Sequence, residues 1–140
     1  MIILDTNVIS ALIHRDPDAR GVAWADRQKR NQLLTTAITV LELRSGAEEL
    51  ESGRRKRKLD ADIEWALDEL LDGRILSFDR KAAYETAAWS RSRKKAGRPI
   101  ETRDAQIAGI AAARNIPIAT RDLGDFEDVG VRLIDPWAAN

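Results

Sequence analysis

Short apolar runs alternate along this chain with longer amphipathic stretches, and this alternation is the feature that most restricts its fold. Strand-like runs are expected at 2–5, 33–36, 74–78, 116–120 and 131–134. Helical patterns lie between them at 8–13, 19–30, 40–51, 55–71, 81–95 and 103–114. Because connections of this length join parallel strands, the sequence predicts an α/β fold: a central parallel sheet of about five strands with helices on both faces.

Length and composition indicate one domain covering residues 1–140, since the 140-residue chain has no internal repeat, low-complexity tract or linker. The absence of Cys excludes a disulfide scaffold, a zinc–cysteine site and thiol catalysis. The single His, His14, is expected at the surface near a helix end. No apolar run approaches the roughly 20 residues of a membrane span, and no secretory signal is visible, so we expect a cytoplasmic protein.

Charge is balanced overall, with 23 Lys and Arg against 23 Asp and Glu, which argues against a uniformly basic nucleic-acid surface. Ten of these 23 basic residues nevertheless lie in two runs. The first comprises Arg54, Arg55, Lys56, Arg57 and Lys58, and the second Arg91, Arg93, Lys94, Lys95 and Arg98. Such runs are often solvated helix faces. Two of them in a small neutral domain suggest contacts to RNA phosphates, or equally to an acidic partner surface.

Acidic residues occur where the predicted strands and helices meet one edge of the sheet. Asp5 ends the first run, Glu42 lies in the first turn after the second, and Asp104 opens the helix before the fourth. Asp122 follows the fourth run, and Asp125 comes one turn later. Since like charges at one edge repel and raise each other's pKa, this arrangement is costly unless a cation binds there.

Most of these carboxylates also have a structural explanation. Asp5 is able to cap the following helix or form an Asx-turn, and the loop residues Asp122 and Asp125 are able to act as solubilising charges. Glu42 fits a capping box with Thr39, in which it accepts a bond from the Thr39 amide; this is at least as good an explanation as metal binding. Asp104 is harder to explain, because it falls on the apolar face of its helix.

Four segments together resemble the PIN-domain family. They are Ile2-Ile3-Leu4-Asp5-Thr6-Asn7, Thr39-Val40-Leu41-Glu42-Leu43-Arg44-Ser45-Gly46, Asp104-Ala105-Gln106-Ile107-Ala108 and Ala119-Thr120-Arg121-Asp122-Leu123-Gly124-Asp125-Phe126. The chain is most similar to the ribonuclease toxins of the VapBC type, including the FitB-like branch. This resemblance implies a metal-dependent endoribonuclease with Asp5, Glu42, Asp104 and Asp122 as its acidic quartet. Metal ligands would be Asp5, Asp104 and Asp122, with Glu42 and Asp125 as further possible ligands.

The resemblance further implies supporting residues and partners. Thr6 and Asn7 match residues that support the first Asp, and Thr120 matches a Ser or Thr that borders the site. The partners implied are RNA, such as tRNA or a similar structured RNA, and an antitoxin with a DNA-binding N-terminus. A homodimer and a toxin–antitoxin hetero-oligomer are also implied. No membrane is expected as a partner.

Oxygen-only ligands select Mg²⁺ or Mn²⁺ over zinc. A bound metal lowers the pKa of a coordinated water, so hydrolysis is expected to leave a 5′-phosphate and a 3′-hydroxyl. Two alternatives stay open. One is a phosphate-ester hydrolase with Asp5 as nucleophile, although the second Asp that such enzymes need is replaced here by Asn7. The other is a non-catalytic RNA-binding or interaction module.

Overall fold

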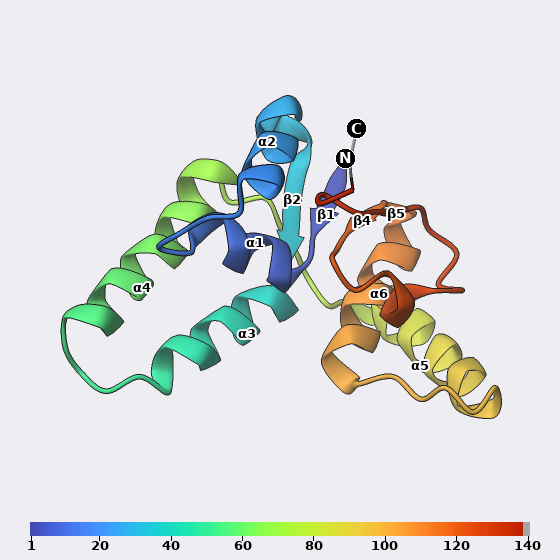
Figure 1. Cartoon of the computed structure of the whole chain (residues 1–140). Coiled ribbons are helices and arrows are strands. Elements are labelled where there is room, and N and C mark those ends of the chain that lie inside the picture. The colour runs from blue at the N-terminus through green and yellow to red at the C-terminus, as the bar shows by residue number, and fades with distance from the viewer. Residues whose placement is uncertain (139–140) are drawn as a thin grey trace.

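The computed structural model describes residues 1–138 and contains a five-stranded parallel sheet (Figure 1). Each strand pairs in parallel with its neighbours, in the order β3-β2-β1-β4-β5. The strands are β1 (Ile2–Leu4), β2 (Leu33–Thr36), β3 (Ile75–Leu76), β4 (Ile118–Ala119) and β5 (Leu133–Ile134). The predicted parallel sheet is therefore confirmed, although four of the five strands are shorter than the apolar runs that predicted them.

Six α-helices connect and cover these strands. They are α1 (Thr6–Ile13), α2 (Ala19–Arg27), α3 (Ala37–Glu48), α4 (Arg54–Trp65), α5 (Arg80–Lys95) and α6 (Thr102–Arg114). Two 3-10 turns lie at Arg30–Gln32 and Leu123–Phe126, and a π-helical turn at Ala66–Leu70 continues α4. None of the helices within residues 1–138 is both long enough and apolar enough to cross a bilayer.

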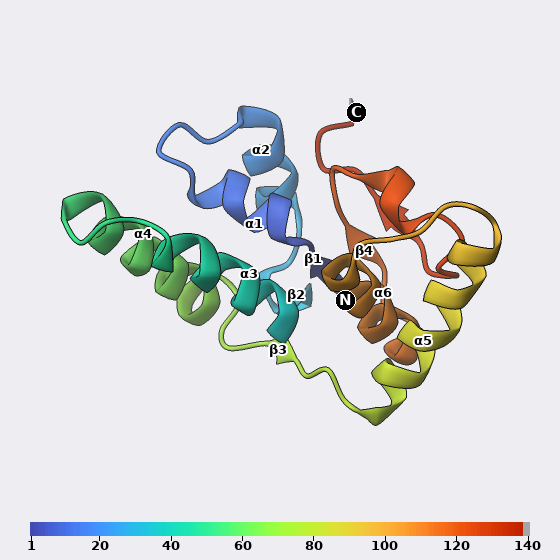
Figure 2. The same cartoon turned by 90° about the horizontal axis from the view of Figure 1, so that it is seen from below.

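The two faces of the sheet carry separate hydrophobic cores, because successive strand residues point to opposite sides. Ile3 belongs to a core built mainly with α5 and α6, while Leu4 belongs to one built with α1, α2, α3 and α4. Figure 2 shows α5 and α6 on one side of the strands and the first four helices on the other. Helices on both faces, as predicted, are thus confirmed.

Helix α3 begins three residues earlier than its apolar pattern suggests. The Thr36 hydroxyl accepts a hydrogen bond from the Thr39 amide (3.1 Å), so Thr36 is the N-cap. The predicted capping box between Thr39 and Glu42 is therefore wrong, because Thr36 already satisfies the amide that Glu42 was expected to bind. This leaves the Glu42 carboxylate available for other partners.

A close approach between α5 and α6 fixes the helix that carries Asp104. A Cβ built at Gly109 of α6 would lie 1.8 Å from the Thr86 hydroxyl and 2.7 Å from the Ala82 carbonyl oxygen of α5. Any side chain at Gly109 would push the two helices apart. The Thr86 hydroxyl also donates to the carbonyl of Ala105 (3.2 Å), and Ala105 is the residue directly after Asp104.

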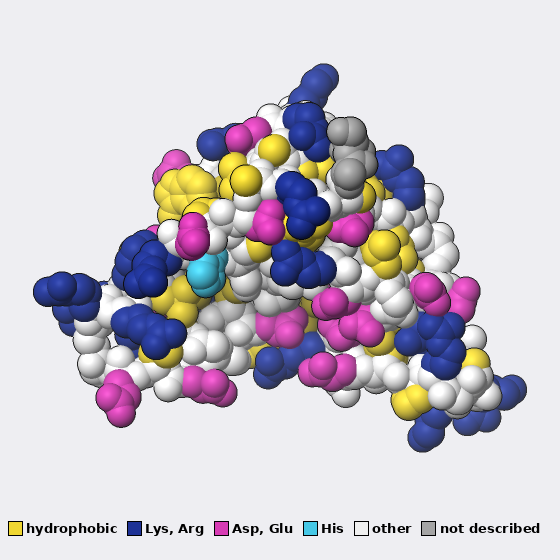
Figure 3. Space-filling model, in the orientation of Figure 1, with side chains coloured by type: hydrophobic (Ala, Val, Ile, Leu, Met, Phe, Trp, Pro, Cys, Tyr) yellow, Lys and Arg dark blue, Asp and Glu magenta, His cyan; other side chains and the backbone are white. Residues whose placement is uncertain are grey.

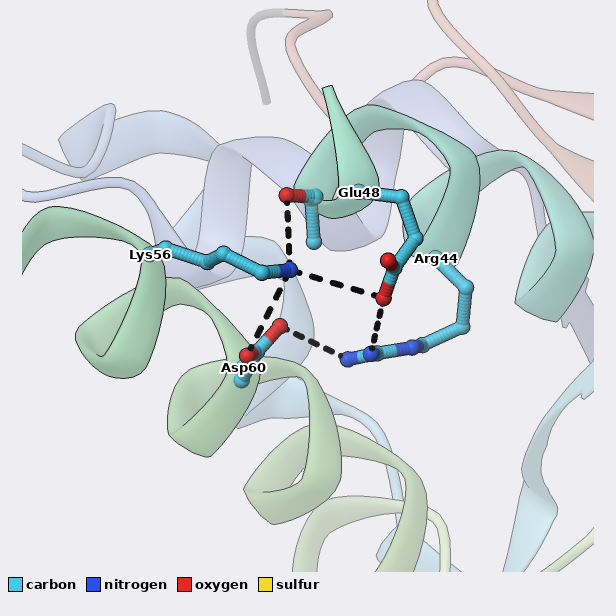
Figure 4. A network of polar contacts seen from close by, with 5 residues as sticks. Arg44, Glu48, Lys56 and Asp60 are labelled. Carbon is cyan, nitrogen blue, oxygen red and sulfur yellow. Dashed lines mark hydrogen bonds and ion pairs between the residues drawn. The ribbon is translucent and has the colours of Figure 1, made fainter. Parts of the chain in front are cut away.

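Ion pairs hold α3 and α4 together as a hairpin that projects from the sheet (Figures 1 and 4). Arg44 contacts Asp60 at 2.8 Å and Glu48 at 3.0 Å, and the Lys56 ammonium lies 3.4 Å from Glu48. Lys56 also donates to the Ala47 carbonyl (3.1 Å). The acidic residues that follow the first basic run thus neutralise part of it, as in the Lys58–Asp62 pair at 2.8 Å.

Strand order creates a crevice where polar side chains can collect. Strand β1 is followed along the chain by β2 on one side of it, whereas β4 lies on its other side. Ligands of open α/β sheets bind outside the carboxyl ends of the strands at such a switch point. In this chain, Asp5 follows β1 and the segment from Thr120 to Asp122 follows β4, so both reach this crevice.

Candidate active site

Asp5 lies at the centre of the crevice and is almost completely buried, with 4% of its surface exposed. It is the N-cap of α1: its Oδ1 accepts from the Thr6 amide (2.8 Å), and its Oδ2 accepts from the Thr120 hydroxyl (2.8 Å). The pKa of Asp5 is raised to about 6: burial is the main cause, the hydrogen bonds from Thr120 and Thr6 oppose it, and the charges of Glu42 and Asp122 add to it. The capping role predicted for Asp5 is real, but it does not remove Asp5 from the crevice.

Thr120 and Asn7 connect Asp5 to Asp122. The Thr120 side chain is fully buried, donates to Asp5 and accepts from the Asp122 amide at 3.0 Å. Asn7 donates from Nδ2 to the Asp122 carboxylate (3.0 Å) and accepts the Arg121 amide on Oδ1 (3.3 Å). These bonds fix the turn after β4 against the start of α1, so the Asp122 side chain is held at the same rim as Asp5.

Glu42 reaches the site from α3. The Thr6 hydroxyl donates to its Oε1 at 2.8 Å and lies 3.0 Å from the Thr39 hydroxyl. Thr6 therefore bridges the first turns of α1 and α3, and it orients Glu42 toward Asp5.

Asp104 completes the cluster from the first turn of α6, where it is half-buried. The pKa of Asp104 is raised to about 7, mainly by burial and in addition by the charges of Asp5, Asp125, Glu101 and Glu42. All four of these neighbours are carboxylates. Such a shift shows that the metal-free site favours a proton on Asp104, and a bound cation would relieve the same repulsion.

These side chains line a hollow of about 590 Å³. We call its carboxylates the acidic rim: Asp5, Glu42, Glu101, Asp104, Asp122 and Asp125. Figure 3 shows acidic side chains gathered at the centre of the face drawn there, and a cluster of Lys and Arg at its α4 end. The single His lies between these two groups. His14 is exposed at the C-cap of α1, as predicted.

A divalent cation suits the chemistry of the acidic rim, because its donors are carboxylate oxygens with hydroxyls and an amide beside them. Within residues 1–138, no three His, Asp or Glu side chains converge closely enough to enclose a bare ion. The carboxylates instead surround an open hollow. Such a hollow leaves room for a cation that keeps several of its water molecules, as Mg²⁺ does when it binds to proteins through one or two carboxylates.

Two charged residues of the hollow, Glu101 and Arg121, were not predicted as site residues from the sequence. Glu101 is the N-cap of α6 but makes no capping bond with its side chain, and Arg121 directly precedes Asp122. The position of Glu101 three residues before Asp104 is a usable signal, because residues at this spacing share a helix face. Arg121 lies in the fourth of the segments that resemble the PIN-domain family, but no role in the site was predicted for it.

The predicted RNA-contacting runs are only partly exposed. The assignment of Arg93 is wrong, because this side chain is 7% exposed, donates to the Arg98 carbonyl (2.9 Å) and lies over the Trp89 ring. Lys56 is held in the α3–α4 ion pairs described above. The exposed members of the two runs are Arg54, Arg55, Arg57, Lys58, Arg91, Lys94, Lys95 and Arg98.

Comparison with known proteins identifies the family. The PIN domain model matches residues 2–131. The chain belongs to the PIN-domain family. Among relatives of this family, it is 44% identical to plasmid stability protein StbB of Pseudomonas syringae pv. tomato, over 99% of this chain and 100% of that protein. It is 39% identical to VapC ribonuclease Y4jK of Sinorhizobium fredii, over 98% of each chain.

A third PIN-domain relative also has a solved structure. Toxin FitB of Neisseria gonorrhoeae is 39% identical over 98% of this chain and 99% of that protein. The structure of FitAB bound to an IR36 DNA fragment matches the present one with a TM-score of 0.90 and 37% identity, over 100% of this chain and 98% of that one. These matches confirm the PIN-like α/β fold.

The raised pKa of Asp104 predicts a measurable effect on stability. Because the folded chain holds this proton up to about pH 7, compared with an ordinary 3.8, its free energy of unfolding falls as pH rises between about 4 and 7. Replacing Asp104 with Asn removes the charge. In EDTA at pH 8, Asp104→Asn should therefore be more stable than the parent by about 1 kcal/mol after allowance for solvent screening, and at pH 4 the two should agree.

Thermal melts of both proteins across this pH range provide the measurement. Asp26→Asn, which changes an exposed carboxylate on α2, is the matched control and should follow the parent at every pH. A lower stability of Asp104→Asn at pH 8 would contradict the view that burial and neighbouring carboxylates destabilise the charged form of Asp104.

Proposed function

We propose that this chain hydrolyses RNA at the acidic rim with a bound Mg²⁺ or Mn²⁺. One observation carries the proposal: carboxylates from four separate segments meet at the switch point of a PIN-domain sheet, where burial, together with the neighbouring carboxylates, raises the pKa of Asp104 to about 7. A fold gains nothing in stability from this arrangement. It is the arrangement expected where a cation is to bind.

Asp5, Asp104 and Asp122 would hold the cation, one or two of them directly and the rest through its bound water molecules, with Glu42 and Asp125 as further ligands. When bound, the cation supplies an activated water and neutralises charge on the phosphodiester. Thr120 and Asn7 would keep Asp5 and Asp122 in place through the hydrogen bonds described above, and Thr6 would do so for Glu42. We assign the fourth position of the quartet to Asp122, because both of its ends are held in place. Asn7 donates to its carboxylate, and the Thr120 hydroxyl accepts its backbone amide.

Family membership and the relatives named ribonuclease and toxin make the chain an endoribonuclease toxin. Its proposed partner is an antitoxin with a DNA-binding N-terminus, and the FitAB complex on DNA supports this assignment. Cellular RNA as substrate makes the cytoplasm the proposed compartment. The predicted homodimer would need apolar surface, and the large apolar side chains with the most exposure beyond Met1 are Leu41, Trp65 and Tyr84.

A second hollow, of about 910 Å³, offers a place for the antitoxin. It lies between α1, α3 and α4 and is lined by the apolar side chains Ile13, Leu43, Leu50, Leu59 and Ile63. Arg15, Arg54, Arg55 and Lys58 border it, and it meets the acidic rim at Thr6, Ser10, His14 and Glu42. An apolar segment with acidic flanks would fit here, and an Arg at its end would reach the acidic rim in place of the cation.

The purified chain should cleave cellular RNA in the presence of Mg²⁺ or Mn²⁺ and should release no inorganic phosphate from small phosphate esters. Gel analysis of the RNA and a phosphate assay provide the two measurements. Release of phosphate with intact RNA would favour the ester hydrolase that uses Asp5. RNA binding without cleavage under every metal condition would favour a non-catalytic module.

A further inference from the structure

Arg121 is a cation inside the acidic hollow that does not neutralise its carboxylates. It is exposed, directly precedes Asp122, and lines the same hollow as Asp5, Asp104 and Asp125. Within residues 1–138, it forms no ion pair with any of these acids. Its guanidinium lies instead over the ring of Trp137, 3.9 Å from the ring centroid. This guanidinium is therefore held by contacts other than ion pairs with the acidic rim.

Two contacts hold it. The Trp137 indole is itself fixed, with 7% of its surface exposed and its ring packed so closely on Gly21 of α2 that a Cβ there would lie 3.2 Å from it. The Arg121 backbone amide donates to Asn7 at 3.3 Å, and Asn7 also binds the Asp122 carboxylate. Arg121 is therefore positioned relative to Asp122 at both ends, by its backbone and by its stacked head group.

The guanidinium N–H groups of Arg121 have no hydrogen-bond acceptor among residues 1–138. The indole covers one face of the planar group, whereas the N–H donors of Arg point outward in the plane, where they match the oxygens of a phosphate. The positive charge of the group is available to an incoming anion, because no carboxylate among residues 1–138 forms an ion pair with it. A phosphodiester that approaches the acidic rim meets repulsion, and Arg121 supplies positive charge at that place.

We propose that Arg121, stacked on Trp137, binds a backbone phosphate of the RNA at the edge of the acidic rim and thereby sets the strand against the carboxylates. The inference rests on the proposed ribonuclease function, and it concerns a residue to which that function assigned no role. Arg121 acts here as a phosphate-binding residue, while Trp137 is its positioning residue.

RNA binding without cleavage tests this directly. In an Asp5→Asn background, we expect Arg121→Met to weaken RNA binding about tenfold and to reduce the slope of log Kd against log salt by about 0.7 to 0.9, the loss of one phosphate contact. Arg121→Lys should keep the slope, because it keeps the charge, but bind more weakly than Arg because it loses the planar stack. In the cleaving parent, Arg121→Met should raise KM far more than it lowers kcat.

The matched control is Arg132→Met. Arg132 is also exposed, but it precedes β5 and so lies at the opposite edge of the parallel sheet. This variant should leave both Kd and the salt slope unchanged. Thermal melts of each variant exclude a loss of fold as the cause.

The outcomes separate the inference from the function beneath it. If the parent cleaves RNA and Arg121→Met binds RNA with unchanged Kd and salt slope, the role of Arg121 is refuted while the ribonuclease assignment stands. If the parent neither binds nor cleaves RNA, both fail. An equal rise in Kd for Arg132→Met would also refute the inference, since the effect would then be one of net charge.

Discussion

Asp5→Asn should lower the rate of RNA cleavage by about 10³-fold or more while the protein remains folded. The charge is lost from the acidic rim, where Asp5 interacts electrostatically with Glu42, Asp104 and Asp122. Removal of a single well-positioned electrostatic group in an active site commonly costs 10² to 10³ in rate, and loss of a metal ligand adds the cost of weaker metal binding.

The fold has no reason to fail in this variant. Asn has the shape of Asp: its oxygen would accept the Thr6 amide, and its amide would donate to the Thr120 hydroxyl, in place of the two bonds that Asp5 accepts now. Since burial and neighbouring charges raise the pKa of Asp5 to about 6, a neutral side chain relieves a cost at neutral pH. We expect the melting temperature of Asp5→Asn in EDTA to be no lower than that of the parent.

Asp135→Asn is the matched control for this comparison. Asp135 follows β5 at the same edge of the sheet and accepts a backbone amide, that of Trp137, at 2.9 Å. It does not line the hollow of the acidic rim. Cleavage by Asp135→Asn should stay within about threefold of the parent. Equal activity in the parent and Asp5→Asn would place the chemistry elsewhere on the molecule.

Metal removal should also lower the rate of cleavage strongly. Dialysis against EDTA is expected to lower the rate by at least about 10²-fold, and addition of Mg²⁺ or Mn²⁺ should restore it. Because both raised pKa values belong to groups that must lose a proton before they bind a cation, the metal concentration needed for half-maximal activity should rise as pH falls from about 8 to 5.

Stability supplies a readout of metal binding that does not depend on activity. A cation that binds only the folded chain stabilises it by about 2.7 kcal/mol at a hundredfold excess over Kd. Mg²⁺ or Mn²⁺ should therefore raise the melting temperature of the parent at pH 8, and this rise should be lost in Asp5→Asn and Asp104→Asn. A fully active chain after EDTA treatment, with no rise in melting temperature on metal addition, would contradict the proposed cation.

Much of the fold was predictable because hydrophobic periodicity reports which side chains are buried. The apolar runs gave the number and direction of the strands, and β2 was predicted to the residue. The errors lie at element ends. Thr36, rather than Thr39, caps α3, and this could not be read from the sequence because both residues are Thr followed three residues later by a polar side chain.

The candidate site was predictable where chain position alone decides placement. Asp5, Asp104 and Asp122 reach the rim because they adjoin strand or helix ends at one edge of a parallel sheet. Arg93 failed for the opposite reason: within a basic run, nothing local distinguishes the side chain that turns inward to bind carbonyl groups from its solvated neighbours. The role of Arg121 depends on Trp137, and the contact between them is not visible in the sequence.

The chemistry of the cleaved ends tests the central claim most directly. A labelled RNA is cut by the parent and by Asp5→Asn in Mn²⁺, and the new termini are identified. Hydrolysis by a cation-activated water at the acidic rim predicts 5′-phosphate and 3′-hydroxyl ends from the parent and no comparable product from Asp5→Asn. Ends that carry a 2′,3′-cyclic phosphate, or the same products from both proteins at the same rate, would contradict the account.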